Sequence, residues 1–245
     1  MKRFGLVGFP LTHSFSRKYF SGKFERENIK DCVYDNFEIP QIQDFPDIVK
    51  THPDLIGLNV TIPYKQQVMP YLNNLDKSAE FVGAVNVIKV NSDKTLTGYN
   101  SNYYGFMESL KKFLSPNFSH IKALILGTGG AAKAVEGALK TLGISYQYVS
   151  RQKEGILSYE QLSQEIISQH QLIINASPVG MFPKSDTYPD LNYSFITPAH
   201  YLYDIVYNPE ITLFMQKGTE QGAKVINGME MLHLQAEKAW EIWNA

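Results

Sequence analysis

The sequence predicts an α/β fold made of two α/β domains, with a C-terminal helix that returns to the first domain. Short apolar segments of strand length alternate with helical patterns along the chain, which is typical of βαβ units and parallel sheets. The last helix is expected over about residues 229–243, and its apolar side chains spread too widely around it for a fully exposed helix. We therefore expect this helix to pack back across the first domain.

The first domain is predicted over residues 1–100 together with 228–245. It is expected to contain a strand, an aromatic-rich helix and four further strands, over residues 3–8, 14–28, 33–39, 55–61, 84–90 and 95–99. The last two strands are joined by the turn-forming sequence Asn-Ser-Asp-Lys, which predicts a hairpin.

The second domain is predicted over residues 101–227, with strands at 123–127, 146–150, 172–176 and 201–206. An Ala-rich helix over 131–142 is ended by Gly143, a residue suited to a C-cap. Ser158 to Gln161 has the pattern of a capping box, which predicts a helix that begins there. Only residues 152–156 separate the second strand from the next apolar stretch, whereas a crossover needs at least about 10–12 residues. We therefore expect a missing crossover helix, or a strand at the sheet edge.

Composition excludes several classes of protein. The 245 residues carry 23 Lys and Arg against 24 Asp and Glu, a net charge of −1, so no basic field suggests nucleic acid. Cys32 is the only cysteine, which excludes an intrachain disulfide, and no Cys/His cluster has zinc spacing. We see no signal peptide and no apolar run near the roughly 20 residues that span a bilayer. We expect a soluble cytoplasmic protein, a monomer or homodimer, that acts on a small molecule without binding nucleic acid or membrane.

A glycine-rich turn lies between a predicted strand and a predicted helix. Residues 127–132 read Gly-Thr-Gly-Gly-Ala-Ala and match the dinucleotide pattern G-x-G-x-x-G/A, with Ala132 in the last place. The first glycine permits a tight turn, and the second lets the backbone approach a pyrophosphate at the helix N-terminus. Such turns also serve as plain connectors, but the strand and helix around this one favour a Rossmann-like cofactor site at Gly127, Thr128, Gly129, Gly130 and Ala131.

The end of the following strand indicates which dinucleotide binds. An NAD site usually has an acidic residue about 20 positions after the glycine turn, where it binds the ribose hydroxyls. This chain instead has Ser150, Arg151 and Lys153, and no acid before Glu154. The planar guanidinium of Arg151 can bind a 2′-phosphate, and Lys153 adds charge. Both cations can also be plain surface residues, but their position after the turn predicts NADP.

Polar side chains gather at the predicted loops of the first domain. Ser14 and Ser16 stand two apart at a helix start, where hydroxyls can bind a carboxylate or simply cap the helix. Asn59, Thr61 and Lys65 follow another strand. Asn86 adds an amide, although it can also merely cap a turn.

These segments resemble the shikimate dehydrogenase family from end to end. The resemblance is carried by His-Ser-Phe-Ser at 13–16, Asn-Val-Thr-Ile-Pro-Tyr-Lys at 59–65, Ala-Val-Asn at 84–86, the glycine turn at 127–132, and the segments 175–181, 204–209 and 227–236. Membership would imply an NADP-dependent, reversible reduction of 3-dehydroshikimate to shikimate on the route to aromatic amino acids. The cofactor would supply the hydride chemistry and the protein the positioning and proton transfer.

The resemblance also assigns roles to individual residues. Ser14 and Ser16 would hold the substrate carboxylate, and Lys65 would be the acid/base. The rest of the substrate shell would be Thr61, Asn86, Tyr207 and Gln235, to which the loop position adds Asn59. Ile205 and Gly228 would border the nicotinamide, and the active site would lie in a cleft between the two domains.

One departure from the family pattern matters for catalysis. The family has Gly-x-Asn-Thr-Asp near the domain junction, with the aspartate paired to the lysine, whereas residues 98–102 read Gly-Tyr-Asn-Ser-Asn. Asn102 can still hydrogen-bond to a ring hydroxyl, but it cannot carry the charge that stabilises an ammonium. Two alternatives stay open: a quinate or dual quinate/shikimate dehydrogenase, which Ser16 disfavours, and a catalytically impaired, dinucleotide-binding homologue.

Overall fold

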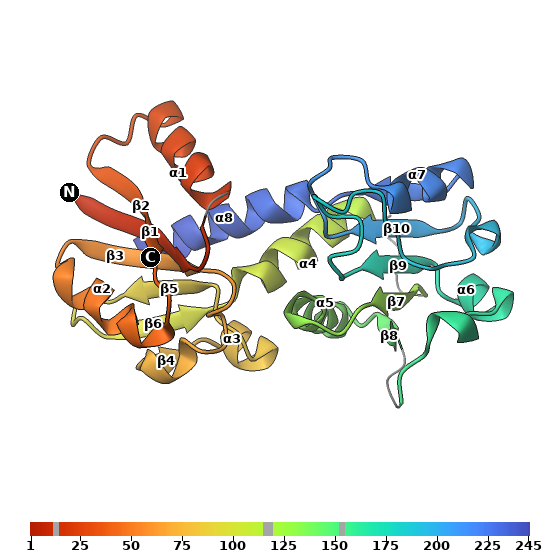
Figure 1. The fold of residues 1–245 in the computed structure, drawn as a ribbon, viewed down its shortest axis with the longest axis horizontal. Coiled ribbons are helices and arrows are strands. Elements are labelled where there is room, and N and C mark those ends of the chain that lie inside the picture. Colours follow the sequence, from red (N-terminus) through yellow and green to blue (C-terminus); the bar gives the residue numbers. More distant parts are fainter. Residues whose placement is uncertain (12–14, 115–119, 152–154) are drawn as a thin grey trace. The chain divides into compact units, whose positions relative to one another are not determined.

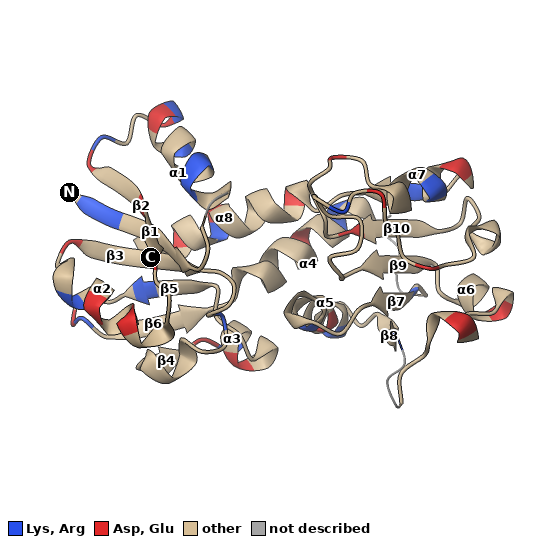
Figure 2. Ribbon diagram, viewed as in Figure 1, with Lys and Arg blue, Asp and Glu red and all other residues tan. Residues whose placement is uncertain are grey.

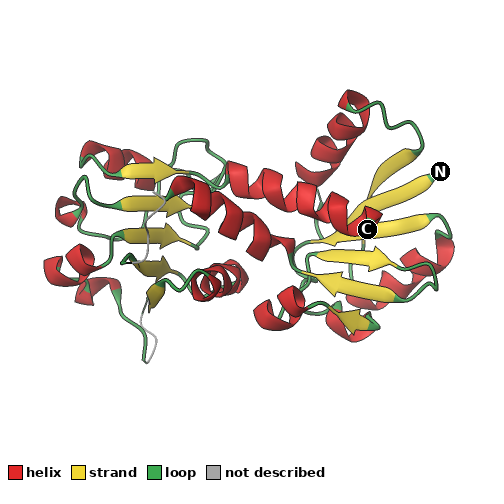
Figure 3. Ribbon diagram, turned by 180° about the vertical axis from the view of Figure 1, so that it is seen from behind, coloured by secondary structure: helices red, strands yellow, loops and turns green. Residues whose placement is uncertain are grey.

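The structure is a computed structural model that describes residues 1–11, 15–114, 120–151 and 155–245. The chain divides into two compact units: unit 1 comprises Met1–Ser101 and Gln235–Ala245, and unit 2 comprises Asn102–Leu234 (Figure 1). Each unit contains one β-sheet with helices packed against it (Figure 3), so the predicted α/β class is confirmed. The last helix, α8 (Met229–Asn244), starts in unit 2 and continues in unit 1.

The sheet of unit 1 has six strands in the order β2-β1-β3-β5-β6-β4. Their bounds are Lys2–Gly8 (β1), Cys32–Glu38 (β2), Leu55–Val60 (β3), Asn74–Leu75 (β4), Val87–Val90 (β5) and Leu96–Tyr99 (β6). β1 pairs in parallel with β2 and β3, and β5 pairs antiparallel with both β3 and β6, as the hairpin prediction requires. β5 begins later than the predicted residue 84, because Val85 donates its N–H to the carbonyl of Lys65, which lies outside the sheet.

Helices cover both faces of this sheet. α1 (Phe15–Arg26) and α8 pack on one face, whereas α2 (Phe45–Thr51) and α3 (Lys77–Val82) pack on the other. Strand alternation explains the division, since Leu6 points to the α1/α8 side and its neighbour Val7 to the α2/α3 side. The prediction that the last helix packs back on the first domain is confirmed, because Ala236, Ala239 and Trp243 are buried in the core of unit 1.

Trp243 fixes the end of α8 on the sheet. Its indole N–H donates to the Ile88 carbonyl at 3.0 Å, and only 3% of the residue is exposed. The ring lies over Gly57 of β3, where an added Cβ would come within 2.1 Å of it. Glycine at position 57 is therefore required by close packing.

We expect Gly57→Ala to destabilise the protein by about 1–3 kcal/mol, the usual cost of overpacking a core. The free energy of unfolding in urea measures it. Gly22→Ala is the matched control, since Gly22 lies inside α1 with only the end of Arg26 nearby, and alanine there should stabilise the helix. Equal stability of Gly57→Ala and the unsubstituted protein would contradict this packing argument.

Unit 2 is built on a five-stranded, all-parallel sheet in the order β11-β10-β9-β7-β8. The strands are Lys122–Leu126 (β7), Ser145–Val149 (β8), Leu172–Asn175 (β9), Tyr201–Asp204 (β10) and Lys224–Ile226 (β11), and the helices are Ser101–Phe113 (α4), Gly130–Thr141 (α5), Gln164–Gln169 (α6) and Leu213–Glu220 (α7). One face packs on α4 and α5, the other on α6 and α7. The three central strands, β7, β9 and β10, are therefore buried on both faces, as parallel sheets require, whereas the edge strands β8 and β11 are partly exposed.

The edge of this sheet accounts for the short connection seen in the sequence. β8 is the edge strand, and the described residues after it, 150, 151 and 155–158, form no crossover helix. Leu157 instead returns as a single parallel bridge to Val149. The helix predicted from Ser158 is wrong: the capping box is present, but it caps only a 3-10 turn over Tyr159–Gln161, and α6 begins later behind its own cap, Ser163.

Acidic and basic residues are interspersed in both units (Figure 2). Within the part of the chain that the structure describes, we find no helix with the length and apolar character needed to cross a membrane.

Candidate functional site

The carboxyl ends of three neighbouring strands meet around the glycine turn of unit 2. β7 and β8 lie to one side of the point where the strand order reverses, and β9 lies to the other. In open parallel sheets, ligands bind outside the carboxyl ends of the strands at this switch point. The turn that follows β7 is therefore in the position where a dinucleotide pyrophosphate binds.

A cavity of about 620 Å³ opens at this edge. Its lining comes from the segments after β7, β8 and β9 and from two later loops: Gly127, Thr128, Gly129, Ser150, Arg151, Ser158, Tyr159, Glu160, Ala176, Ser177, Pro178, Val179, Tyr188, Pro189 and Asp190. The structure thus brings together five of the predicted cofactor residues. The aromatic and acidic residues of the later loops escaped sequence reasoning, because no motif marks them.

The backbone of the turn fits a phosphate group. Gly127 has φ +109°, and a Cβ there would lie 3.2 Å from the Ser177 Cβ, so a side chain is disfavoured on both counts. At Gly129 and Gly130 an added Cβ would meet nothing within 4 Å, which leaves open space against the backbone. Gly129 is the N-cap of α5, whose free N–H groups and dipole favour an anion.

The other predicted cofactor residues are placed as follows. Gly130 and Ala131 form the first turn of α5. Arg151 is exposed on the cavity wall next to Ser150, and Lys153 lies outside the described residues. Gly228 packs on Ile205, because a Cβ there would stand 2.1 Å from the Ile205 carbonyl oxygen.

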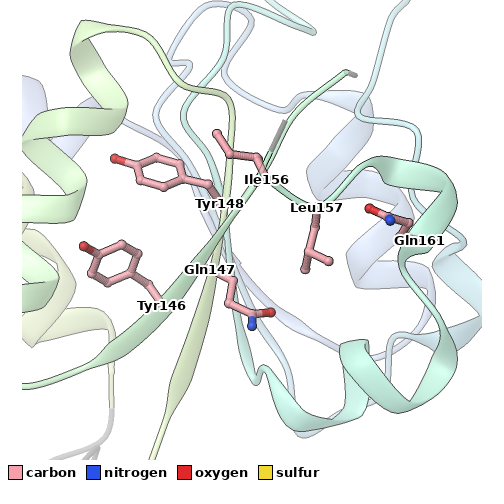
Figure 4. A pocket seen from close by; sticks show the side chains of 7 residues that line it. Tyr146, Gln147, Tyr148, Ile156, Leu157 and Gln161 are labelled. Carbon is pink, nitrogen blue, oxygen red and sulfur yellow. The ribbon is translucent and has the colours of Figure 1, made fainter. Parts of the chain in front are cut away.

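A second cavity, of about 470 Å³, lies along β8 (Figure 4). Tyr146 and Tyr148 project from one side of the strand, and Leu157 and Gln161 come from the segment that follows it. Both tyrosine hydroxyls donate to Glu136 of α5, at 2.6 and 2.8 Å, and Gln161 belongs to the capping box. These polar groups have structural partners, and we assign no ligand to this cavity.

The predicted substrate residues of unit 1 gather where β3 ends. Asn59 lies on β3, Thr61 directly follows it, and Lys65 lies in the turn that Thr61 starts. That turn is joined to the segment before β5, since Val85 donates to the Lys65 carbonyl at 2.7 Å and Val60 to the Asn86 carbonyl at 2.9 Å. Two adjacent segments therefore supply four polar groups: the end of β3 and its turn carry Asn59, Thr61 and Lys65, and the segment before β5 carries Asn86.

Burial changes the acidity of Lys65. It lowers the pKa of the Lys65 ammonium to about 8, because a charged group loses hydration there. A lysine with such a pKa exchanges a proton near neutral pH, which an ordinary surface lysine does not do.

Tyr34 is a residue of this group that the sequence did not reveal. Its side chain is buried on β2, where it stacks on Phe20 of α1 with ring centroids 4.8 Å apart. The hydroxyl donates to Asn59 Oδ1 at 2.6 Å and is also hydrogen-bonded to the Ser16 hydroxyl. Tyr34 thus links two predicted substrate residues, whereas Ser14 lies outside the described residues.

Asn86 and Gln235 differ in how their amides are used. Asn86 donates to the Ser101 hydroxyl at 3.0 Å and accepts from its N–H at 2.7 Å, so it holds the first residue of α4. The alternative left open by the sequence was that Asn86 caps a turn; in the structure its amide bonds the start of a helix instead. Gln235 of α8 has a buried Oε1 with no hydrogen-bond partner among the described residues, as a ligand-binding amide would have.

The remaining two predicted residues belong to unit 2. Asn102 is the second residue of α4 and is half-buried. Tyr207 follows β10 and is also half-buried, and burial raises the pKa of its hydroxyl.

These features define an α/β protein with a Rossmann-like unit and a second unit that carries a polar group around a lysine of lowered pKa. Residues 6–88 match the family model described as the shikimate dehydrogenase substrate binding domain. The chain is 38% identical to a shikimate dehydrogenase (NADP(+)) of Clostridium beijerinckii, over 99% of this chain and 92% of that one. The chain belongs to the shikimate dehydrogenase family.

Solved structures agree with this assignment. The crystal structure of shikimate dehydrogenase from Aquifex aeolicus has a TM-score of 0.85 to this chain at 31% identity, covering 100% of this chain and 92% of that chain. The Thermus thermophilus enzyme in complex with NADP(H) and shikimate has a TM-score of 0.83 at 28% identity, covering 99% and 93% of the two chains. The resemblance seen in the sequence motifs is thereby confirmed.

Proposed function

We propose that this protein is an NADP-dependent oxidoreductase that reversibly reduces 3-dehydroshikimate to shikimate. The observation that carries the proposal is Lys65, whose burial lowers its pKa to about 8 in the turn that also presents Thr61 and adjoins Asn86. The relatives named as NADP-dependent shikimate dehydrogenases support the same reaction and the same cofactor.

Lys65 would act on the proton of the reaction. In the oxidation of shikimate, its free amine would take the carbinol hydroxyl proton at Nζ, and in the reduction its ammonium would return that proton to the carbonyl oxygen. Burial disfavours the charged ammonium of Lys65, which keeps the amine form accessible near neutral pH. NADP, when bound, would accept or donate the hydride at the carbinol carbon.

The other residues would position the substrate ring. Ser14 and Ser16 would donate to the carboxylate, and Asn59, held by Tyr34, would face the ring. The remaining substrate contacts would come from Thr61, Asn86, Asn102, Tyr207 and Gln235. The Oε1 of Gln235 is buried and has no hydrogen-bond partner in the described part of the chain, which supports its part, since a substrate hydroxyl would satisfy it.

The two units would divide the work. Unit 1, predicted as residues 1–100 with 228–245, would bind the substrate, as the family model over residues 6–88 supports. Unit 2, predicted as residues 101–227, would bind NADP in the cavity at Gly127–Gly129, with the 2′-phosphate on Arg151. We further propose a cytoplasmic monomer or homodimer that acts on small molecules without nucleic acid or membrane, in line with its net charge of −1.

A four-way assay tests this function: the purified protein is incubated with shikimate or quinate, each with NADP⁺ or NAD⁺, and reduced cofactor is followed by absorbance. We expect turnover to be fastest with shikimate and NADP⁺. Faster turnover of quinate would favour the quinate alternative. Binding of NADP⁺ without turnover of either acid would favour the impaired homologue, the alternative that Asn102 suggests.

Arg151 is expected to give a preference for NADP⁺ over NAD⁺ of at least about tenfold in kcat/KM, since a charge-assisted hydrogen bond contributes about 1.5–3 kcal/mol. Arg151→Ala should remove most of this preference and leave kcat/KM with NAD⁺ nearly unchanged. Arg26→Ala, at an exposed arginine of α1, is the control and should keep it. Equal efficiency of the unsubstituted protein with both cofactors would refute the role of Arg151.

A further inference from the structure

Two buried polar side chains end neighbouring strands of unit 2. Asn175 is the last residue of β9 and Asp204 the last of β10, and the two are partners in the parallel register. Both are 0% exposed. A fully buried carboxylate at the ligand-binding edge of a parallel sheet requires an explanation, because burial without partners is costly.

The Asp204 carboxylate has donors from three segments. Its Oδ1 accepts from the Asn175 side-chain amide and from the Val206 N–H, both at 3.0 Å, and its Oδ2 accepts from the Thr212 hydroxyl at 2.6 Å. The end of β9, the loop after β10 and the start of α7 are therefore tied to one carboxylate.

This carboxylate determines the orientation of the Asn175 amide. Because an ionised carboxylate can only accept hydrogen bonds, the NH₂ group of Asn175 must face Asp204, which leaves its Oδ1 on the other side. There Oδ1 accepts from the Ser177 hydroxyl at 2.6 Å and from the Ser177 N–H at 3.2 Å, while the NH₂ group also donates to the Val179 carbonyl at 3.1 Å. The loop of residues 176–179 is shaped by these bonds.

The same loop contacts the glycine turn. Ala176, Ser177, Pro178 and Val179 all line the 620 Å³ cavity. Ser177 and the Ala176 carbonyl pack against Gly127 so closely that a Cβ on this glycine would stand 3.2–3.3 Å from them. A continuous set of contacts thus runs from Asp204 through Asn175 and Ser177 to the turn.

We propose that Asp204 is a positioning residue for the dinucleotide site: through Asn175 it holds the loop 176–179 in the shape that NADP binds. Asp204 does not line the cavity itself and acts only through its neighbours. The inference rests on the proposed function, because it takes NADP as the ligand of this cavity. Burial raises the pKa of Asp204 to about 6, so the carboxylate is ionised in a measurement at pH 8.

The test measures the Kd of NADP⁺ for the purified full-length protein by calorimetry at pH 8, without substrate. Asp204→Ala should raise the Kd about tenfold, since the freed Asn175 amide no longer orders the loop. Asp204→Asn should stay within about threefold, because an amide oxygen can still accept from Asn175 and Val206 while its NH₂ faces Thr212. If Asp204→Ala does not fold, Asn175→Ala tests the same link and should also raise the Kd about tenfold.

His200→Gln is the matched control for a purely structural effect. His200 is a 2% exposed polar residue just before β10, at the opposite end of that strand, and its ring bonds to Thr197 and to the Ile167 carbonyl. The His200→Gln substitution should lower the Tm of the protein and leave its Kd for NADP⁺ unchanged.

An unchanged Kd in both Asp204→Ala and Asn175→Ala would overturn the inference. So would a Kd rise in His200→Gln as large as theirs at a similar loss of Tm, because the effect would then be general destabilisation. An unsubstituted protein that does not bind NADP⁺ would instead contradict the proposed function.

Discussion

Replacement of Lys65 by methionine is expected to lower kcat for shikimate oxidation by about 1,000-fold or more, while the Kd for NADP⁺ stays within about twofold. Proton transfer by a positioned side chain contributes about 10²–10⁴ in rate, and among the family motifs Lys65 is the titratable side chain that the resemblance assigns to this step. Methionine keeps an unbranched apolar stem out to Cε, with sulfur in place of the lysine Cδ, and lacks the amine. Initial rates and calorimetric titration with NADP⁺ measure the two quantities.

Lys77→Met is the control for that substitution, because Lys77 is exposed in the first turn of α3 in the same unit. Its kcat should equal that of the unsubstituted protein. Substantial turnover by Lys65→Met would show that another group takes the proton.

The pKa of Lys65 also predicts the pH dependence of the reaction. Oxidation of shikimate requires the free amine, so kcat/KM should rise with pH and level off above the pKa of about 8. Reduction of 3-dehydroshikimate requires the ammonium and should fall over the same range. Rate profiles in both directions between pH 6 and 10 test this sign.

Asn102→Asp is expected to raise kcat, roughly tenfold, and to move the Lys65 limb of the pH profile to higher pH. In the family this position carries an aspartate that is paired with the lysine. A carboxylate stabilises the ammonium, which raises its pKa, and it can hold the reacting hydroxyl as a stronger acceptor. Steady-state rates across pH, compared with the unsubstituted protein, give both effects.

Asn244→Asp makes the same chemical change at the exposed end of α8 and should leave kcat and the profile unchanged. If Asn102→Asp behaves like Asn244→Asp, then the pairing of residues 65 and 102 does not operate in this protein.

The sequence predicts the individual residues of the candidate site better than the hydrogen bonds that hold those residues in place. The glycine turn, the chemistry of Arg151 and the residues around Lys65 were all visible, because each is a residue type that its expected role requires at a given spacing. Tyr34 belongs to no recognised motif, and Asp204 begins the family segment 204–209 without a role that the sequence could assign to it. Each acts through a bond to a residue far along the chain, Tyr34 to Asn59 and Asp204 to Asn175, and no local pattern records such a bond.

The errors in the fold have a similar cause. The capping box at Ser158 is present, so its local hydrogen-bonding prediction is confirmed. The helix predicted to follow it is wrong, because the 3-10 turn ends where Leu162 enters the core of unit 2. The short strands β4 and β11 were missed, because two or three residues carry no periodicity and pair only when a neighbouring strand is in place.

The sequence by itself determined the fold class, the Rossmann-like turn and the buried face of α8, because apolar periodicity and glycine placement act over a few residues. Only the tertiary structure decided the strand orders, the register that sets Asp204 beside Asn175, and the burial that lowers the pKa of Lys65. Strand pairing and desolvation depend on which distant segments come together. That choice is made by the packing of the whole unit rather than by any local run of residues.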